Sequence, residues 1–432
     1  MNYPVWQLDF AGGGLLIALI ATIHVFIAQF AVGGGLFLVL TEIKGRRENN
    51  RQILEYVQRH ARFFLVLTMV LGSLTGIGIW FTISLLSPAA TSTLIHNFVF
   101  AWAIEWLFFL VEIISIFIYT YTFDRLTERD HLRVGWIYAV SAWLSLFFVS
   151  GIIDFMLTPG AWLQTGSFWD GFFNPTFWPA LFFRTFLSLI LAGLFGFLTA
   201  CTVKEVFVRH SLMRYCATWL LVPVVLLLGA AWWYASALPP EVGEMIFHRM
   251  PFLTQYIRLF AICSPLIVLG GLIMAIRMPA GVNRVFAVVM LLIGFCYLGA
   301  FEFIREGGRR PYIIRDHMYA NSIFKKDISS LAQTGVIKAA RWVEQRPITD
   351  SNRVLVGKEL FMTLCLSCHS IGGPMNNILP RTEQLGVREL DMILGSMGRG
   401  YPYMPPFIGT AEEQRALTAF LTTALHNRRE EP

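Results

Sequence analysis

Charged residues are scarce in this chain. Asp, Glu, Lys and Arg make up 14% of the 432 residues, whereas soluble domains usually carry about a quarter. Hydrophobic residues account for 56%, and the mean hydropathy is +0.58. This composition excludes a soluble cytoplasmic enzyme and predicts a protein that lies mostly in a bilayer. The net charge of +6 does not indicate nucleic-acid binding, because the basic residues stand in short clusters between apolar runs.

Apolar runs long enough to cross a bilayer as helices recur through the first three quarters of the chain. They predict an all-α protein whose membrane part is a polytopic helix bundle. The eight predicted spans are 10–41, 61–86, 94–122, 134–157, 177–203, 217–238, 254–276 and 283–304.

Basic residues are missing from the connections on one side of this bundle. Segments 87–97 and 158–180 hold no Lys or Arg, whereas the connection after each odd-numbered span is basic, with Arg277 and Arg284 after the seventh. Under the positive-inside rule the basic connections are cytoplasmic, so the N-terminus and the C-terminus are both expected outside. Residues 1–9 hold no basic residue, and we expect the first span to insert without being removed as a signal peptide.

The composition changes after residue 305, where polar residues become frequent. We expect a membrane domain at 1–315, an amphipathic linker at 316–349 that lies along the membrane surface, and a small soluble domain at 350–432. Apolar residues at helical spacing in GKELFMTL and AEEQRALTAFLTTALH predict a helix near each end of that last domain.

The sequence CLSCH, with Cys365, Cys368 and His369, has the spacing of a haem c attachment site. Two thiols at this spacing can bond to the two vinyl groups of one haem, and the following His can supply an axial nitrogen. A redox dithiol and half of a zinc site are the alternatives. The soluble domain has no second pair of cysteines and no β-α-β pattern around the motif, so we predict one covalent haem c.

A second axial ligand for this haem is expected from the later part of the domain. Met404, in YPYMPPF, is the best candidate because a thioether suits a low-spin electron carrier, and Met397 is its rival. A helix, CxxCH, a Met-Pro loop and a final helix together resemble a class I monohaem cytochrome c. In that family the haem is attached on the outer face of bacterial membranes. The resemblance therefore implies a multi-pass protein of the bacterial inner membrane with its cytochrome c domain on the periplasmic side.

Several ionisable residues fall within or at the ends of the predicted spans, where an unpaired charge is expensive. His24 lies in mid-span, two turns before a Gly triplet, and in a chain with haem we interpret it as an axial ligand rather than a structural histidine. Glu105 and Glu112 are seven residues apart, which places both on one helix face and suits proton handling or cation compensation. The cluster EFIREGGRR at the outer end of the eighth span either anchors the interface or approaches a flat cofactor.

These landmarks, in this order, resemble subunit I of cytochrome bd-type terminal oxidases over about residues 1–320. They are HVFIAQFAVGGG in the first span, IEW and VE in the third followed by FDRL, and EGGRRPY after the eighth. The resemblance implies that His24 is the axial ligand at the haem d position. It implies that Glu306, in a Glu-x-x-Arg pattern with Arg309, is the ligand of a neighbouring high-spin haem b. Two membrane haems of b and/or d type are therefore expected.

The sequence departs from the bd-type pattern at several positions. Glu105 and Glu112 resemble the family's paired acidic residues for proton delivery, but their spacing is one residue shorter. GRRPY, which ends with Arg310, Pro311 and Tyr312, stands where the family typically has GRQPW.

Two further departures concern the entry of electrons. The family binds a low-spin haem b through a His in the fifth span and a Met in the seventh, and Arg184 and Phe260 stand at these positions here. Neither side chain ligates iron in the usual way, and His248 is the only nearby imidazole that could replace the lost ligand. The connection at 239–253 is also too short for the family's quinol-binding loop. We therefore expect that both the low-spin haem and quinol binding are lost.

The sequence thus predicts an oxidoreductase in which a covalent haem c replaces the lost entry point. Electrons are expected to pass from haem c to the haem at Glu306 and then to the haem at His24, where O₂ is reduced to water. The expected donor is a cytochrome c, and the other expected partners are a second membrane subunit of the subunit II type and membrane lipid. An electron-transfer subunit that relays electrons to another membrane complex is the alternative. A haem-based sensor is disfavoured because the cytoplasmic connections are too short to hold a signalling domain.

Overall fold

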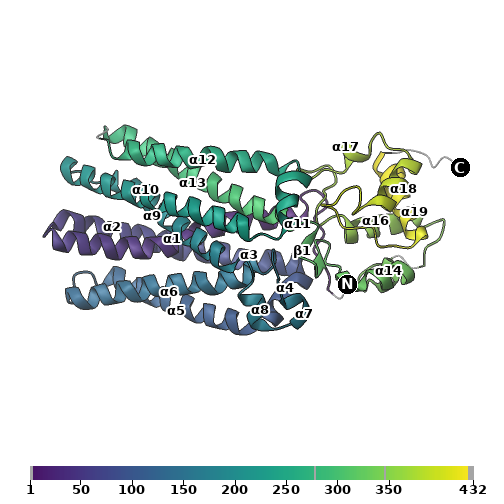
Figure 1. The fold of residues 1–432 in the computed structure, drawn as a ribbon, viewed down its shortest axis with the longest axis horizontal. Helices are drawn as coiled ribbons and strands as arrows, with labels where there is room; N and C mark the ends of the chain where they lie inside the picture. The colour runs from purple at the N-terminus through teal and green to yellow at the C-terminus, as the bar shows by residue number, and fades with distance from the viewer. Residues whose placement is uncertain (1–2, 277–278, 345–346, 427–432) are drawn as a thin grey trace.

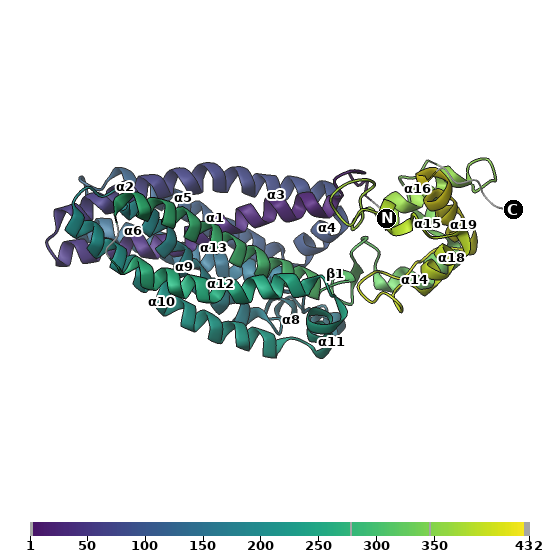
Figure 2. The same ribbon diagram turned by 90° about the horizontal axis from the view of Figure 1, so that it is seen from above.

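Two helical regions lie end to end along the long axis of the molecule (Figure 1, Figure 2). In the computed structural model, which describes residues 3–276, 279–344 and 347–426, a bundle of long helices forms one region and shorter helices form the other. The predicted all-α class is confirmed, apart from a hairpin of β1 (Tyr312–Ile314) and β2 (Met318–Tyr319) between the two regions.

The described residues contain eight helical segments that are long and apolar enough to cross a membrane, which confirms the predicted number. The segments are α1 (Gly13–Arg47), α2–η1–α3 (Arg51–Val66, Leu67–Gly72 and Ser73–Leu86), α5 (Val99–Tyr121), α6 (Glu128–Asp154), α9 (Phe177–Ala200), α10 (Val206–Ala237), α12 (Leu253–Met274) and α13 (Ala280–Gly308). Shorter helices occupy the connections at the end of the bundle that faces the second region: α4 (Pro88–Asn97), α7 (Trp162–Thr165), α8 (Phe168–Phe172), α11 (Pro240–Glu244) and the π-helical η2 (Met245–Arg249).

Several helices extend beyond the apolar runs that predicted them. Helix α1 continues to Arg47 and α2 begins at Arg51, whereas the sequence predicted an end at 41 and a start at 61. A helix satisfies its backbone hydrogen bonds internally, in water as in lipid, so hydropathy marks only the part that lies in hydrocarbon. Arg277, one of the predicted cytoplasmic residues, lies outside the described residues.

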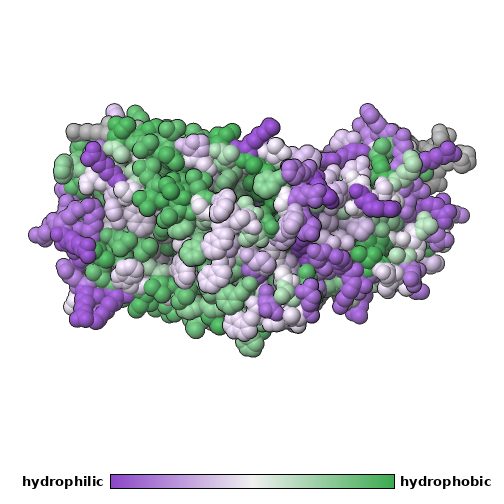
Figure 3. All heavy atoms as spheres, viewed as in Figure 1, coloured by the Kyte–Doolittle hydropathy of each residue, from purple (hydrophilic) through white to green (hydrophobic). Residues whose placement is uncertain are grey.

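Large apolar side chains cover the sides of the bundle. Figure 3 shows hydrophobic surface over its middle and hydrophilic surface both at the far end and over the second region. Ile77, Phe100 and Trp232 are each at least 70% exposed. Such exposure to water is unfavourable, and the apolar belt therefore fits contact with lipid.

Three consecutive glycines allow α1 to approach three other helices closely. A Cβ atom at Gly33 would lie 1.9 Å from the carbonyl oxygen of Ser188 in α9. At Gly34 it would lie 2.4 Å from a phenylalanine ring of α2, and at Gly35 it would lie 2.4 Å from a tyrosine ring of α6. Small residues at a helix contact let backbones come together where larger side chains would separate them.

The second region has its own core. Helix α16 (Arg353–Leu364) packs against α19 (Ala411–Ala419) and the π-helical η4 (Phe420–Ala424), and α18 (Val387–Ser396) packs beside α19. Leu360, Phe361, Leu417 and Phe420 are buried in this core.

Part of the segment predicted as an amphipathic linker contributes to the core of the second region. It forms two short helices, α14 (Ile328–Thr334) and α15 (Val336–Ala339), separated by Gly335 at φ +88°. Val336 and Ile337 are buried in the same cluster as the residues of α16. The glycine interrupts the apolar pattern, so one long amphipathic helix does not form.

Candidate functional site

The CLSCH motif follows directly on the C-terminal end of α16. The backbone N–H of Cys365 donates to the carbonyl of Phe361, and that of His369 donates to the carbonyl of Cys365, each at 2.9 Å. Neither cysteine forms a disulfide, and each residue is partly exposed. Burial of the sulfur raises the pKa of the Cys365 thiol to about 12, so it is neutral at neutral pH. Two free thiols on one turn beside a histidine fit the attachment of one haem c.

The ring of His369 is held in one orientation. Its Nδ1 lies 2.9 Å from the carbonyl oxygen of Asn376, and a carbonyl only accepts, so Nδ1–H donates and Nε2 keeps its lone pair. Burial lowers the pKa of His369, which favours the neutral ring. A neutral imidazole with its Nδ1–H bound to a carbonyl is the usual state of an iron-ligating histidine.

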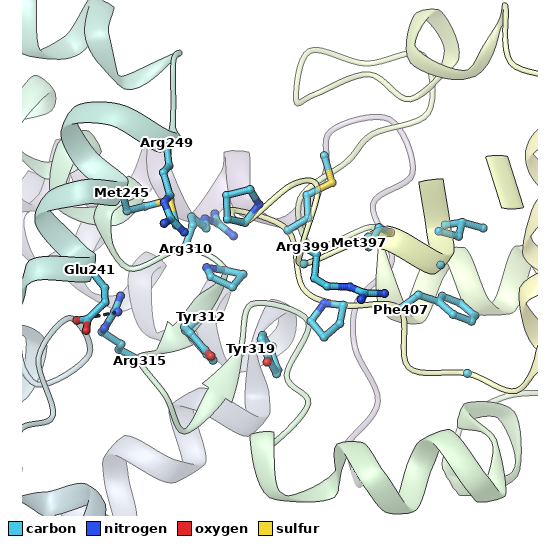
Figure 4. A pocket seen from close by; sticks show the side chains of 18 of the residues that line it. Glu241, Met245, Arg249, Arg310, Tyr312, Arg315, Tyr319, Met397, Arg399 and Phe407 are labelled. Carbon is cyan, nitrogen blue, oxygen red and sulfur yellow. Dashed lines mark ion pairs between the residues drawn. The ribbon is translucent and has the colours of Figure 1, made fainter. Parts of the chain in front are cut away.

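A cavity of about 630 Å³ lies between the membrane bundle and the second region (Figure 4). This volume is in the range of about 300–1,000 Å³ found for sites that bury a small molecule or cofactor. Met404 and Met397 both line the cavity, together with Phe407. The structure thus brings the two methionine candidates to one cavity, and the choice between them remains a prediction.

The residues just before α1 hold the CLSCH loop against the membrane bundle. The backbone N–H of Ile371 donates to the carbonyl oxygen of Asp9 at 2.7 Å. A Cβ atom at Gly373 would lie 1.6 Å from the carbonyl oxygen of Phe10. The two chain segments therefore touch through their backbones, a contact that no sequence motif indicates.

Substituting alanine for Gly373 should separate these segments, because a backbone clash cannot be relieved by rotating a side chain. We expect amide exchange at Ile371 to become about tenfold faster, which corresponds to about 1.4 kcal/mol of lost local stability. Hydrogen-exchange mass spectrometry of the peptide 366–376 measures this. Gly386→Ala is the matched control, since a Cβ at Gly386 meets nothing closer than 3.8 Å. Equal protection in the two variants would show that the segments do not touch.

In the membrane bundle, His24 is oriented in the same way as His369. The hydroxyl of Thr75 donates to the carbonyl oxygen of Leu71 at 2.6 Å, so its oxygen is left to accept from Nδ1 of His24 at 3.1 Å. Nε2 of His24 then keeps its lone pair and is available to a metal. A Cβ atom at Gly76 would lie 3.1 Å from Cε1 of the ring. The π-helical turn η1 ends just before Thr75, and such turns are frequent at functional sites.

The depth of His24 relative to Glu306 follows from the antiparallel contact of α1 with α13. A Cβ at Gly299 would lie 3.6 Å from Thr22, and the rings of Phe26 and Phe295 are 5.2 Å apart. These two contacts place His24 level with position 297. Glu306 follows nine positions later (306 − 297), about 13 Å nearer the end of the bundle that faces the second region, at 1.5 Å per residue.

Glu306 lies at the end of α13 within a row of ion pairs. Arg305 Nη2 lies 3.1 Å from Glu306 Oε1, and Arg309 Nη2 pairs with the other oxygen. Arg309 also donates to the carbonyl of Ile313 at 3.1 Å. The side chain of Glu306 remains 37% exposed, and each carboxylate oxygen has a second lone pair. The carboxylate can therefore ligate iron while the two arginines hold it.

Glu105 and Glu112 lie on α5, which packs chiefly against α6. The hydroxyl of Ser145 in α6 donates to Glu105 Oε1 at 2.9 Å. Glu112 is 7% exposed, and its Oε1 has no hydrogen-bond partner in the described part of the chain. Among the described residues, neither Glu105 nor Glu112 makes a hydrogen bond with His24. The structure therefore shows no direct contact between the two carboxylates and the candidate ligand.

Arg184 and Phe260 do not fit a low-spin haem. Arg184 is 1% exposed and donates to Glu302 Oε1 at 2.6 Å, with Asp154 at 4.0 Å. The ring of Phe260 stacks on Tyr297 at 4.3 Å between centroids. A paired guanidinium and a stacked phenyl ring offer no ligand to iron. His248, the suggested replacement, is exposed on η2.

A buried network that was not predicted from the sequence lies near the end of α1, at the end of the bundle away from the second region. The carboxylate of Glu42 is fully buried and accepts from His131 Nδ1 at 3.0 Å, from Tyr119 at 2.7 Å and from Arg46 Nε at 2.7 Å. The four residues join α1, α5 and α6. The one available signal was the spacing of four between Glu42 and Arg46, which favours an ion pair on a helix.

A second histidine shares part of the arrangement seen at His24. Nδ1 of His60 lies 2.8 Å from the hydroxyl of Thr199, and its Nε2 has no partner among the described residues. The ring is 0% exposed and is enclosed by Phe30, Phe37 and other aromatic rings. The surrounding aromatic rings make His60 a buried residue of the bundle core.

Comparison with known proteins agrees with this arrangement of helices. Residues 15–238, about half of the chain, match the family model described as cytochrome bd terminal oxidase subunit I. The solved structure of bd oxidase from Geobacillus thermodenitrificans superposes with a TM-score of 0.61 at 16% identity, over 71% of this chain and 90% of that chain. At this identity the likeness shows the fold. No curated protein sequence matches. The chain, a multi-pass membrane protein, therefore belongs to the cytochrome bd terminal oxidase subunit I family.

Proposed function

We propose that this chain is the haem-binding subunit of a bd-type respiratory oxidase that takes electrons through a covalent haem c and delivers them to O₂. The observation that carries this proposal is the order of three candidate ligand sites along one axis. Cys368 lies outermost and contacts Arg310, Glu306 follows at the end of α13, and His24 lies about 13 Å deeper.

The haem c would be held by the second region, which comprises residues 350–432 together with α14 and α15. Cys365 and Cys368 would form the thioether bonds, and His369 would supply one axial nitrogen through Nε2. Met404 would supply the second ligand, since a soft thioether favours the reduced iron of an electron carrier. Met404 lines a cavity whose walls come from both the second region and the membrane bundle, although the CLSCH residues do not line it. This position between the two regions supports electron transfer from one to the other.

In the membrane bundle, His24 and Glu306 would hold two haems of b and/or d type. When bound, these haems would carry the electrons and the iron at His24 would reduce O₂ to water. Arg305 and Arg309 hold the Glu306 carboxylate in place through their ion pairs. Glu112 and Glu105, on one helix face in an apolar span, would hold protons that the reaction consumes.

A cytochrome c is proposed as the donor in place of quinol. Arg184 and Phe260 leave no site for the low-spin haem, and α11 and η2 fill most of the short connection where the quinol-binding loop would stand. Electrons would then enter through the haem c on the outer face.

Members of the family typically pair with a second membrane subunit, and we propose such a subunit here, with the remaining apolar belt facing lipid. No nucleic-acid partner is proposed.

Oxygen uptake by the purified membrane complex tests this function. The complex is fed in turn with reduced cytochrome c and with a quinol. We expect uptake with cytochrome c and none with quinol. An absence of uptake with both donors, although the haems are reduced, would favour an electron-transfer subunit that passes electrons to another complex. Uptake with quinol alone would contradict the loss of the low-spin site.

A further inference from the structure

Arg310 joins the membrane bundle to the haem c motif. It follows directly after the Glu306–Arg309 segment, and its Nη1 lies 3.0 Å from the sulfur of Cys368. A sulfur accepts hydrogen bonds whether it is a thiol or a thioether, so the contact is compatible with an attached haem. Arg310 also lines the cavity between the two regions.

We propose that Arg310 contacts haem c at the Cys368 thioether and raises the reduction potential of that haem, so that the membrane domain sets the potential of its own electron donor. This inference rests on the proposed function only in requiring that haem c is attached. The thioether bond would fix one edge of the haem beside Cys368, and that edge would therefore face the membrane bundle.

The charge around this cavity favours the same conclusion. Four arginines line it, Arg249, Arg310, Arg315 and Arg399, against one acidic residue, Glu241. Figure 4 shows these side chains on both sides of the space. Glu241 pairs loosely with Arg315 at 3.8 Å, and Arg249 pairs with Glu244 at 2.7 Å. A positive charge in a partly closed site is screened less than one on an open surface, and it opposes the gain of positive charge when iron is oxidised.

The two positions at which GRRPY departs from the bd-type pattern are both on this cavity. Arg310 and Tyr312 each line it, and the ring of Tyr312 stacks on Tyr319 of β2 at 4.6 Å. Tyr312 begins β1 and Arg310 precedes it by two residues, so both departures lie where the chain passes from α13 into the hairpin, on the wall that faces the second region. If these residues act on haem c, it follows that Arg310 and Tyr312 lie on the same wall of the cavity.

A redox titration of haem c, followed by its absorption in the full-length complex, tests the proposal. In Arg310→Gln we expect the equilibrium constant for reduction to fall about tenfold, a shift of 59 mV for one electron. Arg310→Lys keeps the charge and should restore most of the potential. Arg388→Gln is the matched control, because Arg388 is an exposed arginine of the second region, which holds Cys368, and it does not line the cavity.

A wild-type potential in Arg310→Gln, with haem c attached, would overturn the inference. If the Arg310→Gln protein does not accumulate, Arg310→Met is the second variant. Methionine fills similar space without a charge, so we expect the same fall in the equilibrium constant for reduction of haem c. Haem staining on a denaturing gel reports attachment separately. A wild-type chain without covalent haem would contradict the proposed function itself, whereas attached haem with an unchanged potential would contradict only the role of Arg310.

Discussion

Replacing His24 with alanine should remove one membrane haem and abolish oxygen uptake. His24 is the candidate ligand whose Nε2 is free because Nδ1 donates to Thr75. Loss of a ligand should cost more than the roughly 10- to 100-fold that follows when a ligand's hydrogen-bond partner is removed. Thr75→Val removes only that partner. Its haem content and its oxygen uptake should therefore lie between those of His24→Ala and those of the wild type. Haem content per chain and oxygen uptake with reduced cytochrome c measure both effects.

The control for this series is His96→Ala. His96 is an exposed histidine of α4 whose Nδ1 contacts the carbonyl of Ser92 at 2.7 Å, and its loss should leave haem content and uptake unchanged. A high-spin haem signal that persists at wild-type intensity in His24→Ala would remove the main support for the assignment. A normal haem content in Thr75→Val with reduced oxygen uptake would still agree with His24 as a haem ligand, because the Thr75 hydroxyl orients the ring.

Replacing Glu302 with alanine should cost about 3–5 kcal/mol of stability, because it leaves the buried guanidinium of Arg184 without its close partner. Asp154 lies 4.0 Å away, and its oxygens have no hydrogen-bond partner among the described residues. Arg184→Met should cost less, since Glu302 keeps Arg305 at 3.0 Å. Unfolding of the detergent-solubilised protein by sodium dodecyl sulfate, followed by tryptophan fluorescence, measures this difference.

A surface ion pair provides the comparison. Arg51 and Glu55 pair at 3.3 Å with side chains that are 90% and 56% exposed, so Glu55→Ala should cost less than about 1 kcal/mol. Equal costs for Glu302→Ala and Glu55→Ala would mean that water reaches Arg184. In that case the space next to the guanidinium is open, and packing around Arg184 does not exclude a haem at this position.

Hydropathy and charge were sufficient to predict the membrane part of the fold. The eight spans follow from apolar runs alone, because lipid allows only helices with internally paired backbones. The extent of the helices was not predictable in this way, as the continuation of α1 to Arg47 shows. Residues 328–339 form two short helices, and the apolar residues that indicated an amphipathic segment contribute to the core of the second region.

The candidate site was predictable only where a motif or a family pattern marks it. Cys365, Cys368 and His369 are recognised by spacing, and the structure adds the orientation of the His369 ring. Glu42 and His131 escaped notice because they come from different helices and meet only in three dimensions. The contact of Asp9 and Phe10 with the CLSCH loop was equally hidden, since it runs through backbone atoms that carry no sequence signal.

The π-helical turn η1 has a consequence for how the second span can be varied. Each residue of an α-helix turns the chain by about 100°, so the wider turn at Leu67–Gly72 changes the direction in which every later side chain of α3 points. Deleting one residue from this turn would restore a regular helix without breaking the span. It would also rotate Thr75 away from His24, and the membrane would hold an intact helix that no longer orients the His24 ring.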